Sequence, residues 1–313
     1  MSTMKAVRIH NYGGIDVLAY EDAPRPTPKE GEVLIRLAAT SVNPFDCAVR
    51  AGYMAGYFNY SLPLILGTDV SGVIEELGPG TNTFKRGDEV YARAGVTKDG
   101  ANAEYVVAPV SDVAAKPASL DHIQSAALPH VTLTAWQALI ELANLTKGQT
   151  VLIHAAAGGV GHIAVQLAKW RGAKVIGTAS QNIEFLGELG VDQAIDYSAT
   201  PFESVVRDVD VVLDAVGGDT QERSWSVLKP GGILVSTVQM PSEETAAAQG
   251  KRQAMVFSSP PIGKVLTEVA ALVSAGIINP HVSTVLPLGD IKTAHEMVEG
   301  RHTHGKIVLE IAR

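Results

Sequence analysis

Val151-Leu-Ile-His-Ala-Ala-Ala-Gly158-Gly159-Val160-Gly161-His-Ile-Ala-Val165-Gln-Leu-Ala168 joins an apolar run, three glycines and a second apolar segment in one stretch. The run before the glycines is typical of a buried strand, and the apolar residues after them recur at helical spacing. Because glycine has no Cβ, the backbone can turn sharply there, and the free N–H groups of a helix start can face a negative charge. The stretch therefore predicts a strand, a phosphate-binding turn and a helix.

This glycine pattern matches the dinucleotide-binding fingerprint G-x-G-x-x-G except at its first position, which is Ala156. One alternative is a tight turn that binds nothing. Another is a membrane-spanning helix, since the stretch contains no Lys, Arg, Asp or Glu. We reject the membrane interpretation because three glycines, two histidines and a glutamine suit a bilayer span poorly. The prediction is that a dinucleotide's pyrophosphate binds at Gly158, Gly159, Val160 and Gly161.

The residues about 20 positions beyond the first glycine predict which dinucleotide binds, because NAD-binding proteins place an Asp or Glu there, on the ribose 2′-hydroxyl. The chain has Thr178-Ala-Ser180-Gln181-Asn182 and no carboxylate. Ser180 leaves room for a 2′-phosphate, which favours NADPH as the cofactor. Gln181 and Asn182 stand where an Arg or Lys would clamp that phosphate, so we expect a modest preference over NADH. A polar turn and helix cap explains Ser180 and Asn182 equally well.

Composition limits the class of protein. The chain has 313 residues, is 46% hydrophobic and carries a net charge of −8, which suits a globular protein of two domains and argues against nucleic acid or an anionic membrane as the main partner. The N-terminus enters an alternating strand without the apolar core of a secretory signal. One cysteine, Cys47, allows no intrachain disulfide. We therefore expect a cytoplasmic protein.

Hydrophobic patterning predicts an α/β protein of two domains. Residues 1–123 contain short strands between Gly and Pro residues, whereas residues 124–275 alternate strands with helix-length segments, which is typical of a doubly wound parallel sheet. Residues 276–313 end in a strand, Lys306–Ile311, which we expect to rejoin the first domain. The strands predicted for the second domain start at Val151, Lys174, Ala194, Val209 and Gly232.

Several motifs, in order, resemble the medium-chain dehydrogenase/reductase superfamily and, within it, the zinc-free quinone oxidoreductase branch that includes zeta-crystallin. They are Ser41-Val-Asn43-Pro44-Phe-Asp46, Gly67-Thr-Asp69-Val-Ser71-Gly72, Gly87-Asp88-Glu-Val90, the glycine turn, Asp214-Ala-Val-Gly217-Gly218 and Gly305-Lys306-Ile-Val. The resemblance covers essentially the whole chain. It implies a GroES-like β-rich catalytic domain over 1–123 and 276–313, a Rossmann domain over 124–275, and an active site in the cleft between them.

The resemblance also bears on metal binding. Zinc-dependent members hold a catalytic zinc with a Cys, a His-Glu pair and a further Cys or Asp. This chain has Thr68 and Asp69 at the His-Glu positions and no second thiol beside Cys47. Because zinc takes three protein ligands even at an open site, we predict no metal. Cys47 is expected to be a buried or half-buried side chain, with a reactive thiol as the alternative, and the pair His302 and His304 is expected to lie in a solvated loop.

Without a Lewis acid, the acceptors that suit hydride transfer are those that delocalise the resulting charge. The leading hypothesis is an NADPH-dependent quinone reductase. A close alternative is an enone or 2-alkenal reductase that reduces a C=C bond, and the choice depends on the loop at residues 53–60. A third hypothesis is a catalytically silent NADPH-binding sensor or structural protein.

By resemblance, Asn43, Asp46 and Tyr53 are the candidate catalytic residues, with Tyr53 the better proton or hydrogen-bond donor. Each also has a structural explanation: a turn for Asn43, a helix cap for Asp46 and packing for Tyr53. Further candidate cofactor contacts, also by resemblance, are Thr132, Tyr197, Val216, Gly217, Gly218 and Lys306.

Relatives in this family form dimers through the edges of their Rossmann sheets. The candidate edge in this chain is Ala254-Met-Val-Phe257, which is short and apolar. The alternative is that this segment is an interior strand. The resemblance therefore predicts a homodimer.

Overall fold

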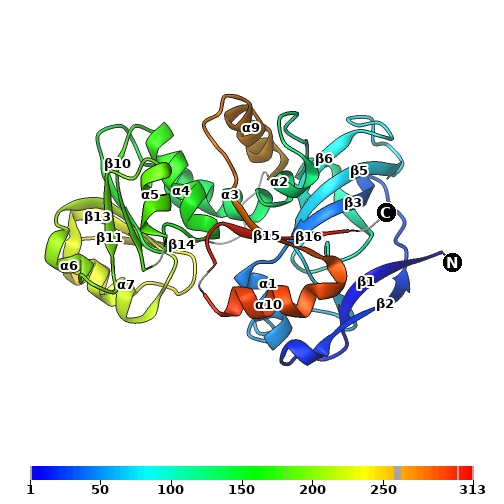
Figure 1. Ribbon diagram of the computed structural model, residues 1–313, viewed down its shortest axis with the longest axis horizontal. Helices are drawn as coiled ribbons and strands as arrows, with labels where there is room; N and C mark the ends of the chain where they lie inside the picture. The colour runs from blue at the N-terminus through cyan, green and yellow to red at the C-terminus, as the bar shows by residue number, and fades with distance from the viewer. Residues whose placement is uncertain (1, 181, 257–261, 302, 312–313) are drawn as a thin grey trace. The chain divides into compact units, whose positions relative to one another are not determined.

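The computed structural model describes residues 2–180, 182–256, 262–301 and 303–311 (Figure 1). The chain divides into two compact units. Unit 1 contains Met1–His130, Pro261–Ala275 and Pro280–Arg313, and unit 2 contains Val131–Pro260 and Gly276–Asn279.

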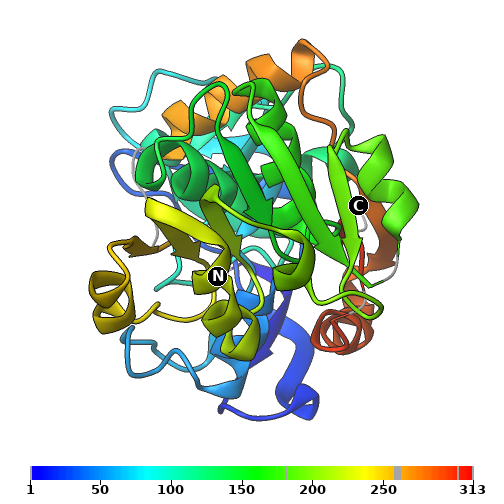
Figure 2. The same cartoon turned by 90° about the vertical axis from the view of Figure 1, so that its left-hand side faces the viewer.

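Unit 2 is built on a six-stranded parallel sheet in the order β11-β10-β9-β12-β13-β14 (Figure 2). Numbered along the chain, this order is 3-2-1-4-5-6, that of the doubly wound dinucleotide-binding fold. The strands are β9 (Thr150–Ile153), β10 (Lys174–Ala179), β11 (Gln193–Asp196), β12 (Val209–Asp214), β13 (Leu228–Ser236) and β14 (Arg252–Met255). The predicted parallel sheet is therefore confirmed.

Helices connect these strands, and the apolar runs of the sequence become the core of unit 2. Leu152, Val212 and Leu234 are completely buried in one cluster together with Trp225 and Phe202. The helices are α3 (Pro129–Trp136), which continues into a π-helical segment at Gln137–Leu142, α4 (Gly159–Trp170), α5 (Ile183–Glu188), α6 (Phe202–Val205), α7 (Gly218–Ser224) and α8 (Glu243–Ala248). No helix in the described ranges is long and apolar enough to span a bilayer.

Unit 1 is β-rich, as predicted. Its larger sheet runs β15-β16-β3-β5-β6-β8, with β7 also paired to β3, and its smaller sheet runs β2-β1-β4. The strands are β1 (Thr3–Ile9), β2 (Leu18–Pro24), β3 (Glu32–Ser41), β4 (Leu64–Ile65), β5 (Asp69–Leu77), β6 (Glu89–Arg93), β7 (Tyr105–Pro109), β8 (Val113–Ala115), β15 (Val282–Pro287) and β16 (Lys306–Glu310). Its helices are α1 (Pro44–Ala51), α2 (His122–Ala126), α9 (Ile262–Ser274) and α10 (Ile291–Glu299). Because β16 pairs with β3, the final strand does rejoin the first domain.

The division of the chain differs from the predicted boundaries at 123/124 and 275/276. The first change of unit falls after His130, and α9, which we expected in the Rossmann domain, belongs to unit 1. Helix α9 packs closely on unit 1: the hydroxyl of Tyr91 donates to the Leu266 carbonyl, and Gly263 lies against the carbonyl of Ser111. Residues 276–279 stay with unit 2, where Asn279 exchanges two hydrogen bonds with the side chain of Gln166.

Candidate functional site

The glycine turn lies at the carboxyl end of β9, beside the point where the strand order of the sheet reverses. Gly158 caps α4, which begins at Gly159. A Cβ on Gly161 would lie 2.2 Å from the carbonyl oxygen of Ala155, so a larger residue there would push the helix away from the turn. The N–H groups of the first helical turn have no partner within the helix. This cradle fits a pyrophosphate.

The end of β10 carries the residues predicted to distinguish NADPH from NADH. Ser180 is half-buried directly after the strand, and Asn182 has a left-handed backbone (φ 58°) at the start of α5. Gln181 lies outside the described residues. The helix-cap explanation of Asn182 has limited support, because its side chain makes no capping hydrogen bond to α5.

The loop after β12 is held by side chains that sequence reasoning missed. One carboxylate oxygen of Asp214 accepts the N–H groups of Val216 (3.0 Å) and Gly217 (2.8 Å). Its other oxygen accepts from Gln221 and Ser236, and the side chain of Gln239 accepts from the N–H of Gly218. Asp214 is completely buried and fixes this loop, which contains three of the predicted cofactor contacts. An Asp at a strand end before two glycines is the sequence signal for such a turn.

The two other cofactor candidates in unit 2 differ in exposure. Thr132 is buried in α3, and its hydroxyl has no hydrogen-bond partner among the described residues. Tyr197 follows β11 and is 55% exposed. A buried hydroxyl without a partner suits a site that a ligand completes, whereas the position of Tyr197 leaves its ring accessible.

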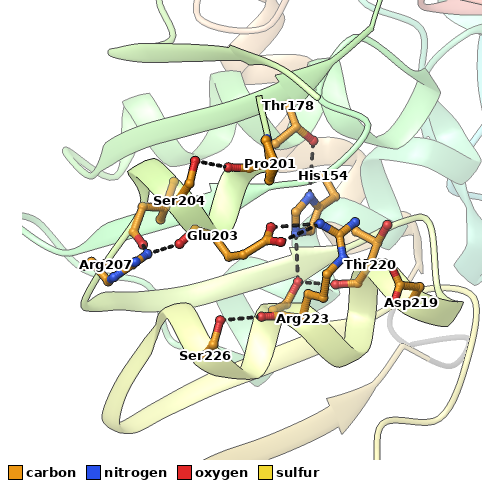
Figure 3. Close-up of polar contacts among 12 residues, drawn as sticks. His154, Thr178, Pro201, Glu203, Ser204, Arg207, Asp219, Thr220, Arg223 and Ser226 are labelled. Atoms are coloured by element: carbon orange, nitrogen blue, oxygen red, sulfur yellow. Dashed lines mark hydrogen bonds and ion pairs between the residues drawn. The ribbon is translucent and has the colours of Figure 1, made fainter. Parts of the chain in front are cut away.

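His154, the residue after β9, sits in a buried polar network (Figure 3). Its Nδ1 lies 3.1 Å from Thr178 Oγ1 on β10, and its Nε2 lies 2.9 Å from Ser224 Oγ on α7. The ring meets Phe202 edge-on at 4.6 Å. Burial lowers the pKa of His154 to about 4. The neutral His154 ring thus links the end of β9, where the glycine turn begins, to β10 and α7.

This network predicts a loss of stability in acid. The unfolded state takes up a proton on His154 near pH 6.5, whereas the folded state resists it until about pH 4. Stability is therefore lost as pH falls through this window, by about 3 kcal/mol at ~1.36 kcal/mol per unit. In urea titrations at several pH values, the free energy of unfolding of His154→Gln should depend less steeply on pH than that of the wild type. The expected decrease in slope corresponds to about one bound proton. His10→Gln, at an exposed ring, is the control; an equal change there would contradict the prediction.

Unit 1 contains a buried polar cluster centred on Asn43, Asp69 and Lys306, each at most 3% exposed. The Lys306 ammonium donates to Asn43 Oδ1 (2.5 Å) and the Val42 carbonyl (3.2 Å), and lies 3.5 Å from Asp69 Oδ2. Asn43 Nδ2 donates to Asp69 Oδ2 (2.8 Å) and Thr68 Oγ1 (3.2 Å). Both the NH₂ group and the oxygen of the Asn43 side chain are therefore hydrogen-bonded. The Lys306 ammonium faces the oxygens of Asn43, Val42 and Asp69.

Two carboxylates of this region differ in protonation. Burial raises the pKa of Asp46 to about 7, although its Oδ2 accepts the Asn43 N–H at 2.8 Å. Burial also tends to raise the pKa of Asp69. The Lys306 charge and the hydrogen bonds from Ser41 and Asn43 outweigh this effect and hold the Asp69 pKa below its ordinary value. Asp46 can thus hold a proton near neutral pH, while Asp69 stays charged. The expected helix-cap role of Asp46 is also present, since its side chain caps α1.

A small pocket of unit 1 adjoins this cluster and is lined mainly by apolar and aromatic side chains. Asp46 and Thr68 are on its wall, with Phe45, Tyr60, Leu66 and Val96 among the other lining residues. The rings of His130, Phe45, Phe58 and Tyr60 form a series with successive centroids 6.0, 6.3 and 6.0 Å apart. Sequence reasoning did not single out Tyr60.

Tyr53, the candidate donor from the sequence, lies elsewhere. Its ring is 77% exposed just after α1 and does not line this pocket. Cys47 is buried, as predicted, with its sulfur 3.3 Å from His295 Nδ1. Across residues 2–180, 182–256, 262–301 and 303–311, no group of three or more His, Cys, Asp and Glu side chains could hold a metal. His302 lies outside these ranges, and His304 lies against His281.

Comparison with known proteins identifies the family. Residues 29–118 match the family described as alcohol dehydrogenase GroES-like domain, and residues 189–309 match the zinc-binding dehydrogenase family. The chain is 34% identical to the mitochondrial NAD(P)H oxidoreductase RTN4IP1 of Danio rerio, over 99% of this chain and 92% of that protein. This chain belongs to the medium-chain dehydrogenase/reductase superfamily. The predicted family and fold are therefore confirmed.

Two further relatives of this superfamily member bear on its chemistry. The solved structure of the quinone oxidoreductase from Coxiella burnetii superposes with a TM-score of 0.93, at 37% identity, over 99% of this chain and 100% of that one. The chloroplastic NADPH-dependent alkenal/one oxidoreductase of Arabidopsis thaliana is 33% identical over 98% of this chain and 79% of that protein. The chain is thus an oxidoreductase of the quinone-oxidoreductase type that uses a nicotinamide cofactor.

Proposed function

We propose that this protein is an NADPH-dependent, metal-independent reductase that transfers hydride to quinones. The observation that carries the proposal is the Gly161 cradle at the carboxyl end of β9, followed by a β10 end whose described residues include Ser180 and no carboxylate. A dinucleotide fits the cradle, and a serine accepts a 2′-phosphate where an Asp or Glu would repel it.

In the proposed mechanism, the chain positions the reactants and supplies a proton. When bound, the reduced nicotinamide supplies a hydride. Unit 2 would hold the cofactor at the glycine turn, with the loop that Asp214 fixes as a further contact. Unit 1 contributes Asp46, whose carboxyl can hold a proton near neutral pH and would give it to the reduced acceptor.

The test follows nicotinamide absorbance, with and without EDTA. It measures the oxidation of NADPH and of NADH by 1,4-benzoquinone and by 2-cyclohexenone, and the reduction of the oxidised cofactors by ethanol. We expect quinone turnover that is faster with NADPH and insensitive to EDTA. EDTA-sensitive oxidation of ethanol by the oxidised cofactor would overturn metal independence. Cofactor binding without any turnover would instead favour a catalytically silent NADPH-binding protein.

An enone or 2-alkenal reductase is the second candidate. It is favoured by the similarity to the alkenal/one oxidoreductase of Arabidopsis thaliana, and it would use the same residues. Turnover of 2-cyclohexenone without turnover of 1,4-benzoquinone would make it the better description.

We also propose a homodimer that forms through β14. This strand is the edge of the sheet as described, and its pairing to β13 extends to Val256, whose N–H donates to Ser236. Its outer side therefore offers unpaired backbone groups to a second copy. Phe257, the last residue of the predicted edge, lies outside the described residues.

Charge placed at this edge is expected to separate the subunits. Val256→Asp should convert a dimer into a monomer in sedimentation velocity, because an unpaired carboxylate in an interface is costly. Val205→Asp, at an exposed position of α6 in the same unit, is the control and should leave the dimer intact. A Val256→Asp protein that sediments like the wild type would rule out this interface.

A further inference from the structure

His162 is a buried histidine near the start of α4, four residues after Gly158. Its side chain is completely shielded from solvent, and the residues that follow it, Ile163, Ala164 and Val165, are buried and apolar. A polar ring in such surroundings costs free energy unless it is hydrogen-bonded. Nδ1 of His162 lies 3.0 Å from the carbonyl oxygen of Gly158. Because a carbonyl oxygen can only accept, Nδ1 carries the proton and is the donor.

Two donors therefore hold the Gly158 carbonyl. The backbone N–H of His162 reaches the same oxygen at 2.9 Å, and a carbonyl oxygen has a lone pair for each donor. The C=O and the N–H of one trans peptide point in opposite directions. With this carbonyl held along the helix, the N–H of Gly159, in the same peptide, points out of the start of α4. It is one of the first-turn N–H groups that have no partner within the helix.

This peptide is in particular need of a restraint because it lies between two glycines. Neither Gly158 nor Gly159 has a Cβ, so steric contacts limit the rotation of the peptide less than they would between other residues. Gly158 is also the N-cap of α4 and brings no capping side chain of its own. The imidazole of His162 supplies the missing restraint through the Gly158 carbonyl.

We propose that His162 is a positioning residue for the pyrophosphate of the dinucleotide, because it fixes the peptide whose N–H faces the phosphate. This inference rests on the proposed function, which places a dinucleotide at the glycine turn. A donor that is already oriented before the ligand arrives need not be ordered when the phosphate binds, which strengthens binding. Since NADPH and NADH carry the same pyrophosphate, His162 should contribute equally to the binding of both.

Gln166 lies one turn further along the same face of α4 and provides a matched control. Its Nε2 donates to the carbonyl oxygens of His162 (3.0 Å) and Asn279 (3.1 Å), and its Oε1 accepts the N–H of Asn279 (2.8 Å). Gln166 is thus a second buried polar residue of this helix. Its hydrogen bonds join α4 to residues 276–279 rather than to the glycine turn.

His162→Ala and His162→Ser together separate the hydrogen bond from the volume of the ring. A serine within a helix can donate to the carbonyl four residues earlier, as Ser274 does to Ala270 in α9. We expect the Kd for NADPH and for NADH to rise about 3- to 10-fold in His162→Ala, the effect of one hydrogen bond. His162→Ser should recover most of this loss. The quenching of protein fluorescence on titration with each cofactor, without an acceptor, measures the affinities.

Gln166→Leu controls for a general loosening of α4. It should lower the thermal midpoint, because the backbone groups of Asn279 lose their partners, and it should keep the wild-type Kd for both cofactors. A loss of affinity in Gln166→Leu as large as that in His162→Ala would overturn the inference. So would wild-type affinity in His162→Ala, equal affinities of His162→Ala and His162→Ser, or a loss confined to NADPH, which would place the effect at the 2′-phosphate.

Binding without an acceptor also separates this inference from the proposed reaction. If the affinities follow the expected order and no acceptor is turned over, only the proposed reaction fails and His162 keeps its role. If the wild type binds cofactor and the position-162 variants bind it equally well, only the role of His162 fails. If the wild type binds neither NADPH nor NADH, the dinucleotide site itself is rejected, and the inference with it.

Discussion

Replacing Lys306 by Met is expected to lower the free energy of unfolding by about 3–5 kcal/mol, because the substitution leaves Asp69 as an uncompensated charge in the core. The ammonium of Lys306 also meets two acceptors, Asn43 Oδ1 and the Val42 carbonyl, which lose a donor at the same time. Urea unfolding at neutral pH measures the loss. Methionine is the suitable replacement, since its length and apolar character fill the space of the lysine stem.

A double variant separates lost charge pairing from lost packing. Lys306→Met with Asp69→Asn removes both charges while it retains an oxygen for the hydrogen bond from Ser41, so we expect it to regain most of the lost stability. The single variant should also respond to pH. Without the lysine, burial raises the pKa of Asp69, and stability should fall as pH rises through that pKa. A loss that is the same from pH 4 to pH 8 would contradict this account.

The architecture of unit 2 could be predicted because its strands are apolar runs between recognisable turns. The strands at Val151–Ile153 and Val209–Asp214 are buried along nearly their whole length, which leaves a strong pattern in the sequence. Helix α9 is amphipathic, and it belongs to unit 1, whereas residues 124–275 were expected to form the Rossmann domain. Amphipathicity shows that one face is buried and does not show against what, and the partner of Leu266 is Tyr91, 175 residues away in the chain.

The same limit applies to the candidate site: local features can be predicted from the sequence, whereas contacts between distant residues cannot. The glycine turn is a local feature, so its residues can be found from spacing alone. The pairing of Asn43 with Lys306 joins residues 263 positions apart, and only the fold of β16 onto β3 brings them together. Tyr53 was chosen by family resemblance, and nothing in the sequence of the loop at 53–60 shows that its ring is 77% exposed.

Replacing Gly161 by Ala is expected to weaken NADPH binding by about 100-fold or more, equivalent to ~2.7 kcal/mol at 1.36 kcal/mol per tenfold. The new Cβ would lie 2.2 Å from the Ala155 carbonyl oxygen and 2.7 Å from the Ala156 Cα. Both are backbone atoms, so the clash is relieved only if α4 moves away from the turn and its N–H groups move away from the phosphates. The quenching of protein fluorescence on NADPH titration measures the affinity, and circular dichroism checks that the variant is folded.

Two matched glycine substitutions turn this expectation into a graded test. A Cβ at Gly158 would lie 3.2 Å from the same Ala155 oxygen, whereas a Cβ at Gly187, in α5, meets nothing within 4 Å. We therefore expect NADPH affinity to decrease in the order Gly187→Ala, Gly158→Ala, Gly161→Ala, with the first equal to the wild type and stabilised by about 0.5–1 kcal/mol. If all three folded variants bind NADPH equally well, the pyrophosphate does not sit on this turn. If affinity follows the Cβ distances, the close approach of helix to strand is what makes the turn a phosphate site.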